Sequence, residues 1–157
     1  MADIIAAMHR TDRHDRPAES PAGRSGVSRA RVLVADDHHA MLESLVSVLT
    51  REHDVVATVP DARSLIAAAK DLDPDVLVVD VQMPGLCGIA AAHCLKGGGC
   101  RAKLVFVTMH PEWEYVQDSL ALGPVGFVAK QRLALDLLPA VRSVLQGQPF
   151  VSPSISR

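Results

Sequence analysis

The sequence predicts one α/β domain in which a five-stranded parallel sheet is covered by helices on both faces. Three observations lead to this prediction. Aliphatic strands alternate with amphipathic helices through residues 30–148. The strands are continuous aliphatic runs such as Val76–Val79, which is typical of strands buried on both faces. Aromatic residues make up only 3% of the chain, so Val, Leu, Ile and Ala must build the core.

Five short aliphatic runs are the expected strands. The third is the most distinctive, because Val76–Val79 leads directly into Asp80 and then into a turn at Pro84-Gly85. The carboxyl ends of parallel strands are where ligands bind in open α/β sheets, so Asp80 is a candidate for chemistry. The other four strands are expected at residues 31–35, 55–59, 103–107 and 124–129.

Four helices follow from apolar residues that recur three or four positions apart. They are expected over about residues 39–51, 62–71, 89–96 and 111–122. The third is followed by Gly97-Gly98-Gly99, which neither precedes a helix nor ends in the Lys-Ser/Thr of a phosphate-binding loop. A flexible loop is therefore the better interpretation of these glycines.

The fifth helix contains a proline. Its apolar face is clear, but Pro139 would remove a helical hydrogen bond if it lay in the interior. A helix that begins near Asp136 would place Pro139 in the first turn, where the missing donor costs little. We therefore expect a late start near Asp136 and an end at Gly147.

The two ends of the chain differ from its centre. Residues 1–29 mix charge, Pro, Gly and Ser without apolar periodicity, and we expect a disordered leader. Residues 149–157 are expected to form a C-terminal tail. The 16 Lys and Arg against 18 Asp and Glu lack the basic excess of a nucleic-acid-binding protein, so direct nucleic-acid binding by this chain is not expected.

No feature of the sequence indicates a membrane protein. The N-terminus lacks the basic start of a signal peptide, and no run of about 18 apolar residues is present. Three cysteines, Cys87, Cys94 and Cys100, are odd in number and lack the spacing of metal or redox motifs. Reduced thiols and a cytoplasmic location are the expectation.

Polar residues follow four of the five expected strands. They are Asp36 and Asp37, Asp80, Thr108 and Lys130. Three carboxylates within several Å of one another repel by about 4 kcal/mol per pair at 4 Å and an effective dielectric near 20. A divalent cation would offset this repulsion, and oxygen ligands favour Mg²⁺. Cation, ammonium and hydroxyl around one carboxylate also form a cradle for a phosphoryl group.

With these motifs the sequence closely resembles the receiver domain of two-component response regulators. The resemblance covers about residues 30–148 and rests on Val34-Ala35-Asp36-Asp37-His38, Asp80-Val81-Gln82-Met83-Pro84-Gly85 with Gly88, Thr108-Met109, and Gly126-Phe127-Val128-Ala129-Lys130. It is most similar to the subfamily with a LuxR-type helix-turn-helix. Residues 149–157 of this chain resemble the start of the linker in that subfamily. A natural single-domain regulator and a fragment lacking that DNA-binding domain both fit this pattern.

The resemblance implies a flavodoxin-like fold with strand order 2-1-3-4-5 and a phosphorylation site at Asp80. It also implies a Mg²⁺ site in which Asp37 and Asp80 are ligands, Asp36 acts through water, and the Gln82 carbonyl completes the set. Phosphorylation of this kind makes the domain a signalling module that promotes its own modification, and not a turnover enzyme.

Three further residue roles and several partners follow from the same resemblance. Thr108 would move to bond the phosphoryl group, Lys130 would pair with it, and Phe127 would turn inward. The implied phosphoryl source is a sensor histidine kinase or phosphotransfer protein. The implied output surface is the fourth helix, fifth strand and fifth helix, and a homodimer could form through that surface or through the first and fifth helices.

Three alternatives remain beside this interpretation. A transition-metal site is disfavoured, because adjacent residues on a starting helix point in different directions. The residues that it would use are Asp36, Asp37, His38, His39 and His110. A phosphohydrolase using Asp80 is disfavoured because Gln82 stands where the second acid is usual. The serious alternative is a receiver-like interaction module that works without phosphorylation, and phosphoryl uptake would distinguish it.

Overall fold

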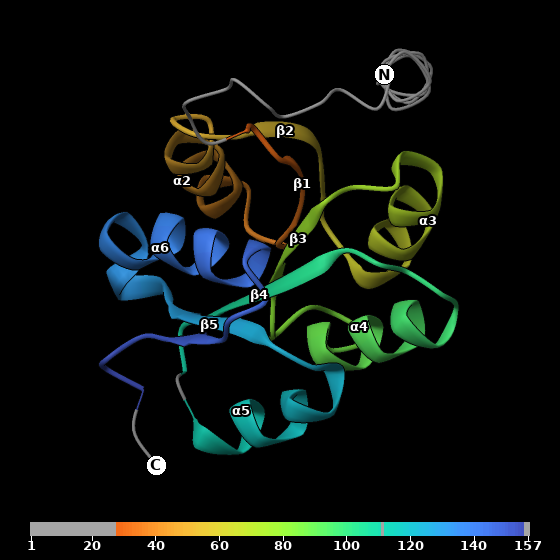
Figure 1. Ribbon diagram of the computed structural model, residues 1–157. Coiled ribbons are helices and arrows are strands. Elements are labelled where there is room, and N and C mark those ends of the chain that lie inside the picture. Colours follow the sequence, from red (N-terminus) through yellow and green to blue (C-terminus); the bar gives the residue numbers. More distant parts are fainter. Residues whose placement is uncertain (1–27, 111, 156–157) are drawn as a thin grey trace.

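A parallel six-stranded sheet forms the centre of the computed structural model, which describes residues 28–110 and 112–155. Its order is β2-β1-β3-β4-β5-β6, and every neighbouring pair is parallel (Figure 1). The predicted fold class and the order 2-1-3-4-5 are confirmed. The strands are β1 Arg31–Ala35, β2 Asp54–Val59, β3 Val76–Asp80, β4 Lys103–Thr108, β5 Val125–Ala129 and β6 Phe150–Val151.

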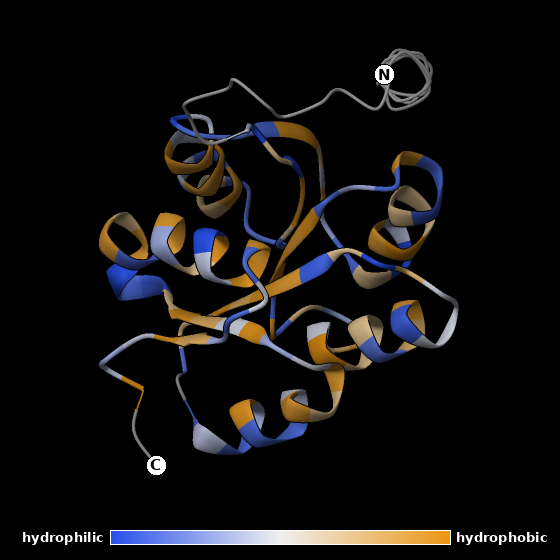
Figure 2. Ribbon diagram, viewed as in Figure 1, coloured by the Kyte–Doolittle hydropathy of each residue, from blue (hydrophilic) through white to orange (hydrophobic). Residues whose placement is uncertain are grey.

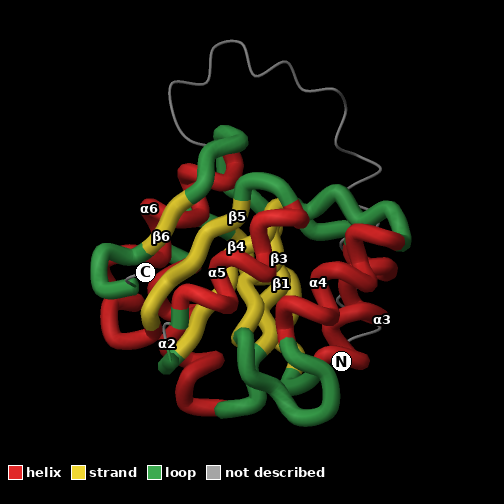
Figure 3. The backbone as a smooth tube through the Cα atoms, turned by 90° about the horizontal axis from the view of Figure 1, so that it is seen from below, coloured by secondary structure: helices red, strands yellow, loops and turns green. Residues whose placement is uncertain are grey.

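Helices cover both faces of the sheet, as Figure 3 shows along its edge. On one face lie α2 (His39–Leu49) and α6 (Leu133–Leu145). On the other lie α3 (Ala62–Leu72), α4 (Gly88–Gly97) and α5 (Trp113–Ser119), the last continued by a 3-10 helix at Leu120–Leu122. The chain therefore crosses over the sheet between successive parallel strands, as βαβ connections require.

Two apolar cores lie on the two faces of the sheet. The central strands β1 and β3 are buried along their whole length, which explains why they read as unbroken aliphatic runs (Figure 2). The core under α3, α4 and α5 contains the two largest buried side chains, Phe106 and Phe127, with ring centroids 5.6 Å apart. The core under α2 and α6 is aliphatic.

The predicted late start of the last helix was wrong. Helix α6 begins at Leu133, which leaves Pro139 in its interior. Leu133, which is buried in the core, and Asp136, which accepts a hydrogen bond from Ser152, hold the first turn through tertiary contacts. These contacts outweigh the one backbone hydrogen bond that Pro139 cannot donate. The helix expected over 111–122 is also shorter than predicted, because its α-helical part spans only Trp113–Ser119.

Strand β6 was not predicted from the sequence. Phe150 and Val151 lie in the segment expected to be a tail, and they pair in parallel with Gly126 and Phe127 of β5. Figures 1 and 3 both show β6 along the outer edge of β5. Ile155 continues this attachment, because it is buried in the core beneath α5. A two-residue strand carries too little apolar pattern to be recognised in a sequence.

Almost all of the expected N-terminal leader lies outside the described residues. Its last residue, Arg29, is described, and its guanidinium binds the Asp54 carboxylate at 2.8 Å. Within residues 28–110 and 112–155, no helix combines the length and apolar character needed to cross a bilayer.

Candidate functional site

The adjacent central strands β1 and β3 bring two buried carboxylates together. Asp36 follows the last residue of β1, and Asp80 is the last residue of β3, while Ala35 and Val79 are register partners. Asp36 is 0% exposed and Asp80 is 3% exposed. Both acids therefore lie at the carboxyl edge of the sheet, where the sequence predicted them to meet.

A lysine that follows β5 binds both carboxylates. Lys130 is 7% exposed, and its Nζ lies 2.7 Å from Asp36 Oδ2 and 3.2 Å from Asp80 Oδ2. The contact with Asp36 is an ion pair without hydrogen-bond alignment, since Asp36 Oδ2 accepts no hydrogen bond from the described residues. Burial of a lysine is unusual unless it is paired, and here two acids pair it.

The environment of Asp80 raises its pKa. Burial raises the pKa of Asp80, and the nearby Asp36 carboxylate raises it further. The Lys130 ammonium and the Gln82 N–H, which donates to Asp80 Oδ1 at 3.2 Å, act in the opposite direction. The pKa of Asp80 therefore stays raised although Lys130 lies beside it.

Two more side chains join this acidic cluster. Ligand atoms of Asp36, Asp37, His38 and Asp80 all lie within 4.8 Å of one another. His38 Nδ1 is 3.0 Å from Asp37 Oδ1, although its side chain is 73% exposed. The expectation that adjacent residues here would diverge was wrong, because these residues lie in the loop before α2, which begins at His39. His39 and His110 are not in the cluster among the described residues.

The donor set of this cluster suits a magnesium ion. Three carboxylates against one ammonium leave two negative charges in a partly buried site, which a divalent cation would balance. All three acids offer oxygen, which hard cations prefer. Asp36, Asp37 and Asp80 are the side chains that could hold such an ion.

Thr108 and Phe127 occupy the positions where the sequence suggested a switch. Thr108 ends β4 and is buried, and its Oγ1 donates to the His110 carbonyl and accepts from the His110 N–H, both at 3.0 Å. Its hydroxyl is therefore engaged within its own loop. Phe127 on β5 is 0% exposed and already lies inward, against Phe106.

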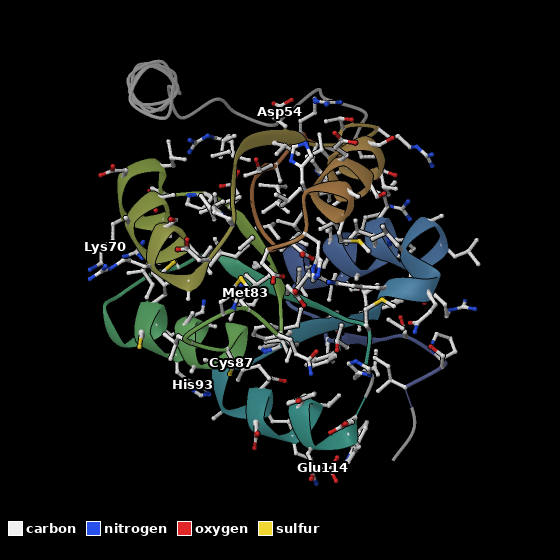
Figure 4. The ribbon with its side chains drawn as sticks, turned by 180° about the vertical axis from the view of Figure 1, so that it is seen from behind. Asp54, Lys70, Met83, Cys87, His93 and Glu114 are labelled. Atoms are coloured by element: carbon white, nitrogen blue, oxygen red, sulfur yellow. The ribbon has the colours of Figure 1, made fainter. Side chains whose placement is uncertain are left out.

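The loop after β3 is held close to Asp80. The Gly88 N–H donates to the Val81 carbonyl at 2.8 Å and so closes the loop at the start of α4. A Cβ at Gly88 would collide with the Asp80 carbonyl oxygen and with Val79 Cγ1, so only glycine fits. Figure 4 shows Met83 and Cys87 on this loop, with Met83 turned into the core.

The profile of the response regulator receiver domain matches residues 32–142. The chain belongs to this family. Its receiver domain is a signalling module and not a turnover enzyme. The match includes every candidate residue around Asp80 and ends before the sixth strand, Phe150–Val151.

Receivers of known regulators are similar to this receiver domain in sequence and fold. The uncharacterized transcriptional regulatory protein YxjL of Bacillus subtilis is 33% identical over 76% of this chain and 56% of its own length. A LuxR-family two-component response regulator from Aurantimonas sp. has 28% identity and a TM-score of 0.77, covering 82% of this chain and 93% of that one.

The receiver domain of RcsB from Salmonella enterica, solved with the phosphomimetic BeF₃⁻, has 29% identity and a TM-score of 0.75. The comparison covers 83% of this chain and 98% of that one. RcsB has also been solved as dimers on DNA, with 29% identity and a TM-score of 0.74 over 83% of this chain and 67% of RcsB. The chain spans 56–64% of the length of eight curated relatives that it matches.

Sequence reasoning missed two buried polar residues near Lys130. Ser152 and Asp136 are 1% and 5% exposed and bond each other at 2.7 Å. The sequence pattern favours a helix cap at Asp136, and Ser152 lies in the expected tail. The sequence offers only one signal for Ser152, which is its place before Pro153 and after the apolar pair Phe150-Val151. This pattern is too short to identify the end of a strand.

Proposed function

We propose that this receiver domain accepts a phosphoryl group on Asp80, with Mg²⁺ bound by Asp36, Asp37, Asp80 and the Gln82 carbonyl. The observation that carries the proposal is that the Lys130 ammonium lies within 3.2 Å of carboxylate oxygens of both Asp36 and Asp80. A buried ammonium beside two acids at a strand end is placed to neutralise phosphoryl oxygens.

The phosphoryl source would be a phosphohistidine on a sensor kinase or phosphotransfer protein. An Asp80 carboxylate oxygen forms a bond to phosphorus while the bond from phosphorus to the imidazole nitrogen breaks, and the electron pair leaves with the imidazole. Lys130 pairs with the phosphoryl oxygens, and Thr108 turns from His110 to donate to one of them. The ion supplies charge neutralisation between the phosphoryl group and the acids.

The output surface would comprise α5, β5 and α6. Thr108 ends β4 just before the loop that leads to α5, and Phe127 lies on β5, one of the three elements of this surface. Homodimers could use this surface or the face formed by α2 and α6, since RcsB forms dimers on DNA. We assign residues 30–148 to the receiver and 149–157 to a linker-like tail, and we propose action in the cytoplasm, where kinases phosphorylate such domains.

The test is incubation of the full chain with Mg²⁺ and acetyl phosphate, followed by intact-mass measurement. The wild type is expected to gain one phosphoryl group, and Asp80→Asn none. Asp118→Asn, which alters an exposed acid of α5, is the matched control and should gain the group. A wild type that gains no mass would favour an interaction module that works without phosphorylation.

A further inference from the structure

We propose that Ser152 is a positioning residue for Lys130, which it steers through the backbone on both sides of the lysine. The inference rests on the proposed phosphoryl transfer, because it gives Ser152 a part in the same site. Ser152 follows β6 and is 1% exposed. It lies outside the matched receiver residues 32–142, so family membership assigns it no role.

Ser152 holds the residue immediately before Lys130. Its Oγ accepts a hydrogen bond from the Ala129 N–H at 3.1 Å, and its own N–H donates to the Phe127 carbonyl at 2.8 Å. Ala129 is the last residue of β5, and the 3-10 helix Lys130–Arg132 follows it. The two bonds therefore fix the backbone at the end of β5, where the chain leaves the sheet and Lys130 follows.

Asp136 extends the same network to the residue two positions beyond the lysine. Ser152 Oγ donates to Asp136 Oδ2 at 2.7 Å. Arg132 donates to the same carboxylate through Nε at 2.7 Å and through Nη2 at 3.2 Å. Hydrogen bonding by Arg132 lowers the pKa of Asp136, so the carboxylate stays ionised as an acceptor.

Lys130 therefore lies between two residues that this network holds. Ser152 bonds Ala129, Asp136 bonds Arg132, and Ser152 and Asp136 bond each other. Such a network is rigid, because a buried polar group that loses its partner is costly. Rigidity matters at this position, since the Lys130 ammonium must reach two buried carboxylates at 2.7 Å and 3.2 Å. Loss of the Ser152 hydroxyl frees the Ala129 N–H and removes one bond to Asp136.

The experiment follows the rate of phosphoryl gain from acetyl phosphate in the full chain with Mg²⁺. Ser152→Ala is expected to slow the reaction roughly 10-fold, as misplaced catalytic groups do. Ser152→Thr keeps the hydroxyl and should react faster than Ser152→Ala. Ser154→Ala changes an exposed serine of the same segment and should match the wild type. An unchanged rate in folded Ser152→Ala overturns the inference and leaves the proposed function standing, whereas no reaction in the wild type defeats the proposed function itself.

A double-mutant cycle separates positioning from simple loss of stability. In a Lys130→Met background, Ser152→Ala should cause no further slowing, although it should still lower the urea midpoint. Equal slowing in both backgrounds would show that Ser152 does not act through Lys130.

A measurement on the wild type covers the case in which Ser152→Ala does not fold. Mg²⁺ with beryllofluoride, bound at Asp80, should slow amide exchange of Ala129 more than that of Leu33, because coupling between sites is reciprocal. Equal slowing of the two amides would overturn the inference.

Discussion

The Lys130 ammonium lies closer to Asp36 than to Asp80, at 2.7 Å against 3.2 Å. The lysine therefore pairs with both acids and lies nearer to the one that is not the proposed acceptor. Asp80 keeps a raised pKa, because burial and Asp36 outweigh the help that Lys130 gives. The proposed Mg²⁺ would supply a second positive charge to these acids, and the first two predictions test that role.

Replacement of Lys130 by Met should destabilise the domain when Mg²⁺ is absent. The buried Asp36 and Asp80 would lose their common partner, and breaking a buried pair in this way costs about 3 kcal/mol. Added Mg²⁺ should restore part of the loss by balancing the acids. Urea unfolding with and without Mg²⁺ measures both effects, and Lys70→Met on the exposed surface of α3 is the control. If Lys130→Met and the wild type are equally stable when both are measured without Mg²⁺, the prediction is contradicted.

Mg²⁺ should stabilise the wild type in proportion to its binding. At 100 times the dissociation constant the gain is about 2.7 kcal/mol. Asp37→Asn removes one carboxylate from the cluster and should weaken Mg²⁺ binding, as loss of a charged ligand does. The same rise in the thermal unfolding midpoint should then require at least roughly 10-fold more Mg²⁺. Glu43→Gln, an exposed acid of α2, should respond as the wild type does. Identical curves for Asp37→Asn and wild type would argue against Asp37 as a ligand.

Two glycines of α4 should respond in opposite ways to alanine. Gly88→Ala places a Cβ against the Asp80 carbonyl oxygen and Val79 Cγ1, and should destabilise by about 2 kcal/mol through overpacking. Gly97→Ala meets nothing within 4 Å and should be neutral or stabilising by up to about 1 kcal/mol, because alanine favours helix. Thermal unfolding of both variants decides the comparison, and a harmless Gly88→Ala would refute the close approach.

Stability should fall as the pH drops below about 6.5 because His53 is buried as the neutral imidazole. Burial is the largest effect and lowers the pKa of His53 from its ordinary 6.5, with Arg29 and Arg142 adding to it and Glu52 and Asp54 opposing it. The unfolded chain therefore binds the proton more readily, so this contribution to stability is full above about pH 6.5 and is lost as the pH falls through the lowered pKa of the folded state.

The slope attributable to His53 can reach about 1.4 kcal/mol per pH unit for one proton. The measurement is the unfolding free energy of wild type minus that of His53→Gln between about pH 8 and about pH 5, the range over which histidine titrates. The difference should shrink as the pH falls. His93→Gln, which changes an exposed histidine of α4, is the control, and a difference that does not vary with pH would exclude His53 as the cause.

Local sequence patterns were sufficient to predict the first five strands and the polar residues at their carboxyl ends. Runs such as Val76–Val79 are interpretable because burial on both faces demands continuous apolar residues. The ends of parallel strands share one edge, so the sequence alone predicts that Asp36, Asp80 and Lys130 lie together. Local pattern suffices there, since each strand carries its own signal.

Features that depend on residues far apart in the chain arise only in the tertiary structure. Helix α6 starts at Leu133 despite Pro139, because burial of its first turn outweighs one missing hydrogen bond. His38 joins the acids because the loop turns back before α2 begins. Ser152 reaches Ala129 and Asp136 only because β6 returns along β5. Such contacts arise from the closing of the fold, and no local periodicity in the sequence records them.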